Sequence, residues 1–387
     1  PTGVENSGWL INGKKPNTAS APGIVSAEMT WETVRSWNIG FDFGLLNNRL
    51  TGSFDYFVRN TLDMIGPAPQ LPATLGATVP KVNNADMKAW GFEVEVSWRD
   101  RIKDFNYGVK FVLSDDQRKV TRYPNEELNR NQWYAGRMDG LVWGYETVGI
   151  AKTDAEMEAH LASLPNGGQS QLGSKWAAGD IMYKDLNGDG KISSGDGTLN
   201  DLGDLKVVAN TQLRFKYGLT LDASWKGFDF SAFFQGVGKR DVVVGGPYFW
   251  GANGQGMWQA AAFKDHMDYF RPEDTESVFG PNVDAYYPRV IFGGGSSEGG
   301  KNTLTQSRYV QNGAYIRLKN LQLGYTLPST ITKKFAVNSL RVYVSGDNLW
   351  TGTKMRVFDP EVLGSTGDAG KAYPLARVWS VGLNVNF

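Results

Sequence analysis

Long runs of alternating apolar and polar residues are the feature that most restricts the fold of this chain. From Trp37 to Leu45 every second residue is Trp, Ile, Phe or Leu, and polar residues or glycine lie between them. Successive side chains of a β-strand point to opposite faces, so period two indicates a strand. The pattern recurs over residues 50–59, 90–98, 105–113, 213–225, 228–238, 315–327, 340–348 and 379–387. We predict an all-β chain with nine antiparallel strands.

The length of these runs leaves two interpretations. Several cover 11 to 13 residues, whereas an ordinary strand has about five or six. A tilted strand that crosses a bilayer needs about 9 to 11 residues, with one face toward lipid and the other toward a wet lumen. A soluble β-sandwich also alternates, with its polar face in water. Alternation alone does not separate a transmembrane β-barrel from a sandwich.

The connections between the runs favour the barrel. Those after Leu45, Trp98, Trp225 and Leu327 are short, whereas residues 60–88, 115–210, 239–314 and 349–376 form long connections rich in Gly, Asn, Pro and charge. Outer-membrane barrels have short periplasmic turns and long extracellular loops. The last run also ends on Phe387, with apolar residues at alternate positions before it, and this resembles the assembly signal of outer-membrane barrels.

Counting strands predicts how the chain is placed. If the short turns are periplasmic, the C-terminus is periplasmic and the first residue of the nine-strand set lies outside the cell. A complete single-chain barrel has an even number of strands. We therefore expect the C-terminal part of a larger multi-pass barrel in a bacterial outer membrane. Residues 1–32 would be an extracellular loop segment and residues 33–387 barrel, with 115–210 and 239–314 as the long loops.

Composition excludes several classes of protein. The chain has no Cys and two His, so cysteine-based catalysis and zinc-cysteine sites are impossible. Its 40 basic and 40 acidic residues give no net charge that would attract nucleic acid. His160 and His266 lie in long connections and are interpreted as solvated loop residues rather than catalytic bases. We expect no enzyme activity and no organic cofactor.

One segment resembles a calcium-binding loop. Residues 185–196 place oxygen-bearing groups at positions 1, 3, 5, 7, 9 and 12 of an EF-hand-like loop, with Gly190 at the sharp turn. The alternative is a turn that its own Asp and Asn side chains hold in shape. Asp196 at position 12 is shorter than the usual Glu. The candidate Ca²⁺ ligands are Asp185, Asn187, Asp189, Lys191 through its carbonyl, Ser193 and Asp196.

Aromatic residues in the long connections are candidates for substrate binding. Exposed rings stack on sugars or pack on peptides. The alternative for each ring is packing within its loop or a place in the interfacial aromatic girdle. The candidates are Trp133, Tyr134, Tyr248, Phe249 and Trp250.

Several segments together resemble the SusC/RagA-like family of TonB-dependent outer-membrane transporters. They occur in the family's order and extend over nearly the whole chain. The matching stretches are residues 31–33, 37–43, 47–52, 179–190, 233–240, 315–328, 340–348 and the closing strand.

The resemblance implies a 22-stranded barrel, of which this chain would supply the last nine strands. It also implies import of oligosaccharide or peptide, a SusD-like surface lipoprotein as partner, and energy from the TonB complex through a plug domain absent from this chain. Two alternatives stay open: a passive porin or adhesin-type barrel, and a soluble calcium-dependent carbohydrate-binding β protein.

Overall fold

The computed structural model describes residues 4–5, 10, 12–15, 18–19, 26, 29–67, 79–253, 262–291, 297–363 and 372–387. The chain divides into two compact units. Unit 1 comprises Pro1–Trp37, Val58–Ala89 and Arg118–Met138, and unit 2 comprises Asn38–Phe57, Trp90–Gln117 and Asp139–Phe387.

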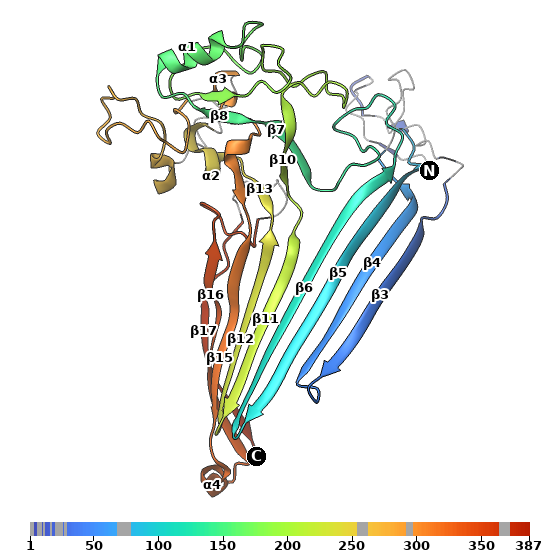
Figure 1. Ribbon diagram of the computed structural model, residues 1–387, viewed down its shortest axis with the longest axis vertical. Helices are drawn as coiled ribbons and strands as arrows, with labels where there is room; N and C mark the ends of the chain where they lie inside the picture. The colour runs from blue at the N-terminus through green and yellow to red at the C-terminus, as the bar shows by residue number, and fades with distance from the viewer. Residues whose placement is uncertain are drawn as a thin grey trace. The chain divides into compact units, whose positions relative to one another are not determined.

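Nine long antiparallel strands form one sheet, as the alternation predicts (Figure 1). Their order is β17-β16-β15-β12-β11-β6-β5-β4-β3. The outer strands β3 and β17 pair with one neighbour each among the described strands, and nearly all their residues are exposed. The strands are β3 Thr33–Leu45, β4 Leu50–Ile65, β5 Asn83–Ile102, β6 Phe105–Arg122, β11 Arg214–Trp225, β12 Phe228–Lys239, β15 Tyr315–Thr326, β16 Ser339–Thr353 and β17 Val378–Asn386.

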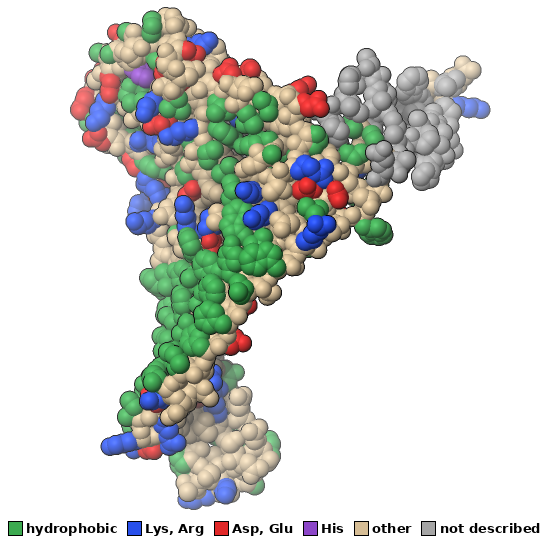
Figure 2. All heavy atoms as spheres, turned by 45° about the vertical axis from the view of Figure 1, so that its right-hand side comes forward, with side chains coloured by type: hydrophobic (Ala, Val, Ile, Leu, Met, Phe, Trp, Pro, Cys, Tyr) green, Lys and Arg blue, Asp and Glu red, His purple; other side chains and the backbone are tan. Residues whose placement is uncertain are grey.

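The register places the apolar residues of successive strands on one face. Leu221 of β11 pairs with Val109 of β6 and with Ala232 of β12, and Ala232 pairs with Leu321 of β15. Directly paired residues share a face. The row continues from Leu323 through Val344 to Val381 of β17. Figure 2 shows the resulting band of apolar side chains.

The opposite face of the same strands is polar. Asp222 pairs with Ser231 and with Gly108, and Arg341 pairs with Asn384. Across this face the Arg341 guanidinium donates two hydrogen bonds to the Asp229 carboxylate, at 2.5 and 2.9 Å.

A β-bulge in β15 interrupts the alternation of apolar and polar residues at Lys319. Both pairings of β15 skip Lys319, so the apolar face changes from even-numbered residues before it to odd-numbered residues after it. A bulge inserts one unpaired residue and re-aims the side chains around it. Arg317 consequently lies on the polar face, although Leu321 and Leu323 lie on the apolar one.

Short hairpins close one end of the sheet. Lys226 and Gly227 join β11 to β12 with φ angles of 46° and 91°, and positive φ at both central residues matches the strand twist. Between β15 and β16 the chain forms the short helices α4 (Ser329–Thr332) and η6 (Lys333–Phe335).

The long connections of unit 2 contain most of the buried core. Tyr183 and Phe249 have no exposed surface, and they lie in an aromatic cluster with Trp250, Tyr287 and Tyr309. Helix α1 begins after Thr153, whose side chain accepts a hydrogen bond from the Glu156 amide and caps it. The elements of these connections are β7 Leu141–Tyr145, β8 Thr147–Ile150, α1 Asp154–Ala162, β9 Ile181–Tyr183, β10 Leu205–Asn210, β13 Asp241–Val243, α2 Pro247–Trp250, η2 Gly251–Asn253, η4 Lys264–Met267, α3 Ser297–Gly300, η5 Ser307–Tyr309 and β14 Val310–Asn312.

Unit 1 contains residues 58–65 of β4, 83–89 of β5 and 118–122 of β6, together with a charge cluster. Arg122 donates two hydrogen bonds to Asp86, at 2.7 and 2.8 Å, and one to Asp63 at 2.9 Å. The short strands β1 (Val4–Glu5) and β2 (Thr18–Ala19) pair with each other in the same unit. Among the described helices, none combines the length and the hydropathy that a membrane-crossing helix requires.

Candidate functional site

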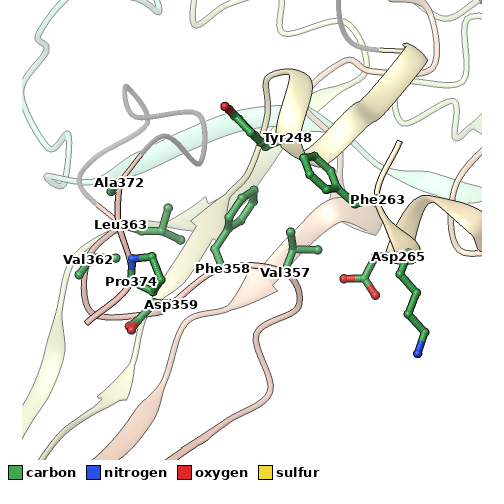
Figure 3. Close-up of a pocket in the computed structure, with 11 residues that line it drawn as sticks. Tyr248, Phe263, Asp265, Val357, Phe358, Asp359, Val362, Leu363, Ala372 and Pro374 are labelled. Carbon is green, nitrogen blue, oxygen red and sulfur yellow. The ribbon is translucent and has the colours of Figure 1, made fainter. Parts of the chain in front are cut away.

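An apolar cavity of about 510 Å³ in unit 2 is the strongest candidate for a binding site (Figure 3). The Tyr248 and Phe263 rings stack with their centroids 5.8 Å apart. They lie on one side of Phe358, with Leu363 and Pro374 on the other. The described lining is Tyr248, Phe263, Lys264, Asp265, Val357, Phe358, Asp359, Val362, Leu363, Ala372 and Pro374.

The wall that carries Phe358 is a strap, which we define as residues 355–363 between β16 and β17. It is fixed to the polar face of the sheet by charge. Arg317 is 2.6 Å from Asp359 and 2.8 Å from Glu361, and its side chain is 3% exposed. Lys319 binds Glu361 as well, at 2.8 Å. Because of the bulge at Lys319, both Arg317 and Lys319 of β15 form ion pairs with the strap.

Arg240 fixes the far end of the strap by donating to the Pro360 and Leu363 carbonyls, at 3.2 and 2.7 Å. Burial is the largest single influence on the Asp359 carboxyl and raises its pKa. The Arg317 hydrogen bond and charge, together with hydrogen bonds from the Glu361 and Leu375 amides, lower the pKa by more in sum, so the pKa is lowered overall. The carboxylate thus stays ionised at the cavity wall.

A second cavity, of about 660 Å³, lies between the strap and the polar face of the sheet. Lys216, Gln235, Arg240 and Glu361 line it, so it is more polar than the first. Leu363 lines both cavities.

The aromatic residues singled out in the sequence lie in three environments. Phe249 and Trp250 are 0% and 6% exposed and belong to the buried core of the long connections. These two rings therefore pack within their loop. Tyr248 is 39% exposed and lines the first cavity. In unit 1, Trp133 packs edge-on against Tyr123 at 6.2 Å, and Tyr134 is half-buried. Tyr248 and its neighbours lie on the same short helix α2, yet only Tyr248 reaches the cavity, a distinction that sequence alone does not provide.

The Asp185–Asp196 loop is held by its own side chains. Asp185 accepts hydrogen bonds from the Gly188 and Gly190 amides, at 2.7 and 2.9 Å. Asn187 accepts from the Asp189 amide, and Asp189 accepts from the Lys191 amide. Within the described ranges, no three His, Cys, Asp or Glu side chains are arranged as a metal site.

Asp204 lies outside this loop but holds it in place, and sequence reasoning missed it. It is fully buried and accepts hydrogen bonds from the amides of Leu186 and Ser193, both at 2.7 Å. Burial first, and then the negative charges of Asp185 and Asp189, raise the pKa of its carboxyl. Asp196 instead accepts from the Thr198 amide. Asp204 lies eight residues beyond Asp196, outside the spacing of an EF-hand loop.

A buried ionic cluster was also absent from the sequence analysis. Lys301 and Asp180 have no exposed side-chain surface, and the Nζ of Lys301 is 3.0 Å from Asp180. Arg289 donates two hydrogen bonds to Asp180, at 2.7 and 2.8 Å. Glu298 is 3.1 Å from Lys301. No local pattern marks these residues, because the chain separates Asp180 from its partners by more than a hundred residues.

The curated proteins that this chain resembles include several TonB-dependent receptors. No family model matches the chain. TonB-dependent receptor P3 of Formosa agariphila is 27% identical over 402 residues, which covers 98% of this chain and 36% of the relative. TonB-dependent receptor SusC of Bacteroides thetaiotaomicron is 23% identical over 373 residues, covering 96% of this chain and 33% of the relative.

A solved structure of the RagAB peptide transporter matches the fold. The TM-score is 0.70 at 22% identity, over 100% of this chain and 38% of that chain. The chain therefore spans about a third of the length of the relatives it matches.

Proposed function

Because this chain resembles the SusC/RagA-like TonB-dependent receptors over nearly its whole length, we propose that it forms part of the wall of an outer-membrane importer. The observation that carries the proposal is the two-faced sheet, whose apolar row runs unbroken from β6 to β17. Lipid requires the apolar face and a wet lumen accepts the polar one. In this orientation the short hairpins and the C-terminus are periplasmic.

Cysteine labelling tests the orientation directly, since the chain has no native Cys. Leu219 and Thr220 are neighbours on β11 that point to opposite faces. In the intact protein we expect Leu219→Cys to react with a lipid-soluble reagent and Thr220→Cys with a water-soluble one. Equal reaction of both variants with both reagents would contradict the membrane assignment.

The lining of the first cavity supports a peptide as substrate. Apolar and aromatic side chains make most of its wall, and Asp265 and Asp359 contribute carboxylates. An apolar peptide side chain gains from leaving water here, whereas sugar hydroxyls would lose hydrogen bonds to water with few replacements. One matching structure is that of a peptide transporter. An oligosaccharide is the second candidate.

Uptake measurements test the substrate class. In cells that carry the intact transporter, Phe358→Ala should raise the half-saturation concentration for peptide uptake about tenfold, the loss expected for one buried aromatic side chain. Phe279→Ala is the matched control, because Phe279 is 60% exposed and does not line the cavity. Equal effects of the two substitutions, or uptake of oligosaccharide alone, would contradict a peptide site at this cavity.

We also propose that the protein works with a SusD-like lipoprotein at its outer side and with the TonB complex through a plug domain outside this chain. A passive porin or adhesin would need neither. Uptake that continues when the proton-motive force is collapsed would favour the passive alternative. Purification without detergent would instead favour the soluble carbohydrate-binding protein.

A further inference from the structure

All four short hairpins lie at the same end of the sheet. They join β3 to β4, β5 to β6, β11 to β12 and β15 to β16, which are successive pairs in the order of the sheet. We call the four connections, together with the last four residues of β5, the hairpin rim: residues 46–49, 99–104, 226–227 and 327–338. Because each connection joins sequence-adjacent antiparallel strands, the rim forms one continuous row.

The hairpin rim is basic, although the chain as a whole is neutral. It contains seven basic and two acidic side chains, against 40 and 40 in the full sequence. Of the acidic pair, Asp100 is already bound to Arg49 at 3.1 Å. No acidic side chain among the described residues forms an ion pair with the remaining rim lysines. The basic residues are Arg49, Arg99, Arg101, Lys103, Lys226, Lys333 and Lys334.

Large apolar side chains are exposed between these charges. Phe335 is 75% exposed and Ile331 is 46% exposed, and helical spacing of four residues places them on one side of the α4–η6 segment. Thr332 fixes that segment, because it is 2% exposed and its hydroxyl donates to the Asn338 carbonyl at 3.4 Å. Trp225 and Ile102 are exposed in two other hairpins, at 49% and 62%.

We propose that the hairpin rim binds the anionic headgroups of the inner, periplasmic leaflet. The inference rests on the proposed membrane orientation and goes beyond it by naming a lipid partner. Exposed apolar side chains with flanking lysines suit the boundary between headgroups and acyl chains. Lysines near that surface attract anionic lipid. A row of charge along four hairpins follows a membrane plane, whereas a protein partner would need a compact patch.

The experiment uses the intact transporter in vesicles of phosphatidylcholine with added phosphatidylglycerol. A fluorescent probe is attached at Phe335→Cys, and a quencher is carried by either lipid at equal amount. We expect stronger quenching by phosphatidylglycerol, with about fivefold enrichment for each nearby lysine at low salt. Replacing both lysines (K333Q/K334Q) should make the two lipids equivalent, as should high salt.

The probe at Val278→Cys is the matched control, because Val278 is 92% exposed in a long connection. Equal quenching by both lipids at Phe335→Cys would overturn the proposal, as would quenching that K333Q/K334Q leaves unchanged. If Leu219→Cys is labelled from lipid while Phe335→Cys is not quenched, the membrane orientation stands and only the lipid site fails. If neither position contacts lipid, the proposed function fails too.

Discussion

Asp180 joins segments of the long connections that lie far apart in sequence, because Arg289, Lys301 and Asn302 all contact its carboxylate. Replacing Asp180 by Asn would leave Lys301 fully buried without its nearest carboxylate. Breaking a buried pair by removing one partner costs about 3–5 kcal/mol. We expect Asp180→Asn to expose the amides of residues 174–183 to hydrogen exchange. Asp284→Asn, which removes the exposed partner of Lys152, should change little because surface pairs contribute little. Similar exchange in both variants would contradict the role of the buried cluster.

Glu298 gives the same cluster a pH dependence. Hydrogen bonds from Ser174, and then Lys301, outweigh desolvation and lower the pKa of this carboxyl to about 2. A lowered pKa stabilises the fold above the ordinary pKa of Glu, and that contribution is lost as pH falls toward 2. Protection of the Ser174 amide should therefore be constant near neutral pH and should decline below about pH 4.3. Glu298→Gln should remove this decline, and a decline at the same pH in that variant would contradict the assignment.

Calcium binding by the Asp185–Asp196 loop stays a proposal, with the six ligands that the spacing predicts. We expect a dissociation constant of about 10⁻⁴ to 10⁻³ M, as in extracellular modules, measured by calorimetry on the intact protein. Asp189→Asn should weaken the heat, whereas Asp284→Asn, at an exposed carboxylate outside the loop, should preserve it. No heat at millimolar Ca²⁺ would rule the site out.

These residues show where prediction from sequence stopped. Spacing located the turn that Asp185 and Asn187 hold, because its hydrogen bonds are local; calcium binding there stays a prediction. Asp204 and Lys301 act through contacts that only the fold creates, so no spacing rule finds them. Phe249 and Tyr248 are adjacent in sequence, yet one is buried and the other lines a cavity. Whether a side chain in a long connection is buried depends on which other segment of the chain packs over it.

Strands could be predicted because their environment is regular along the chain, whereas the environment of a loop residue is not. Alternation found all nine, because each strand has a face with one kind of neighbour along its whole length. It missed the bulge at Lys319, where the face of β15 changes. It also ended β6 before Arg122, since the outer residues of that strand no longer alternate.

At the scale of a strand, the two faces should differ in their tolerance of charge. Leu221→Arg should destabilise the barrel by about 2–4 kcal/mol if it lies near the bilayer midplane, because the guanidinium would face lipid. Thr220→Arg places the same side chain on the polar face and should cost little. Denaturant unfolding in bilayers measures both. Equal destabilisation would contradict the assignment of faces.

For the whole molecule, the open edges of the sheet are decisive. Strands β3 and β17 have unpaired backbone groups along one side in the described part of the chain, and each such group costs several kcal/mol in lipid. We expect residues 1–387, expressed alone behind a signal peptide, to give no closed barrel and no uptake. The measurements are heat-modifiable migration and transport. A closed, transport-active product would contradict the partial-barrel interpretation.

The length of β5 has a consequence at the cell surface. Its 20 residues extend about 66 Å at about 3.3 Å each, and a tilt near 45° leaves a height of about 47 Å. Hydrocarbon accounts for about 30 Å of that height. With the hairpins at the periplasmic side, the remaining height of about 17 Å would carry the first residues of β5 beyond the hydrocarbon on the opposite side. Antibodies raised against the start of β5, at Asn83, would then bind intact cells.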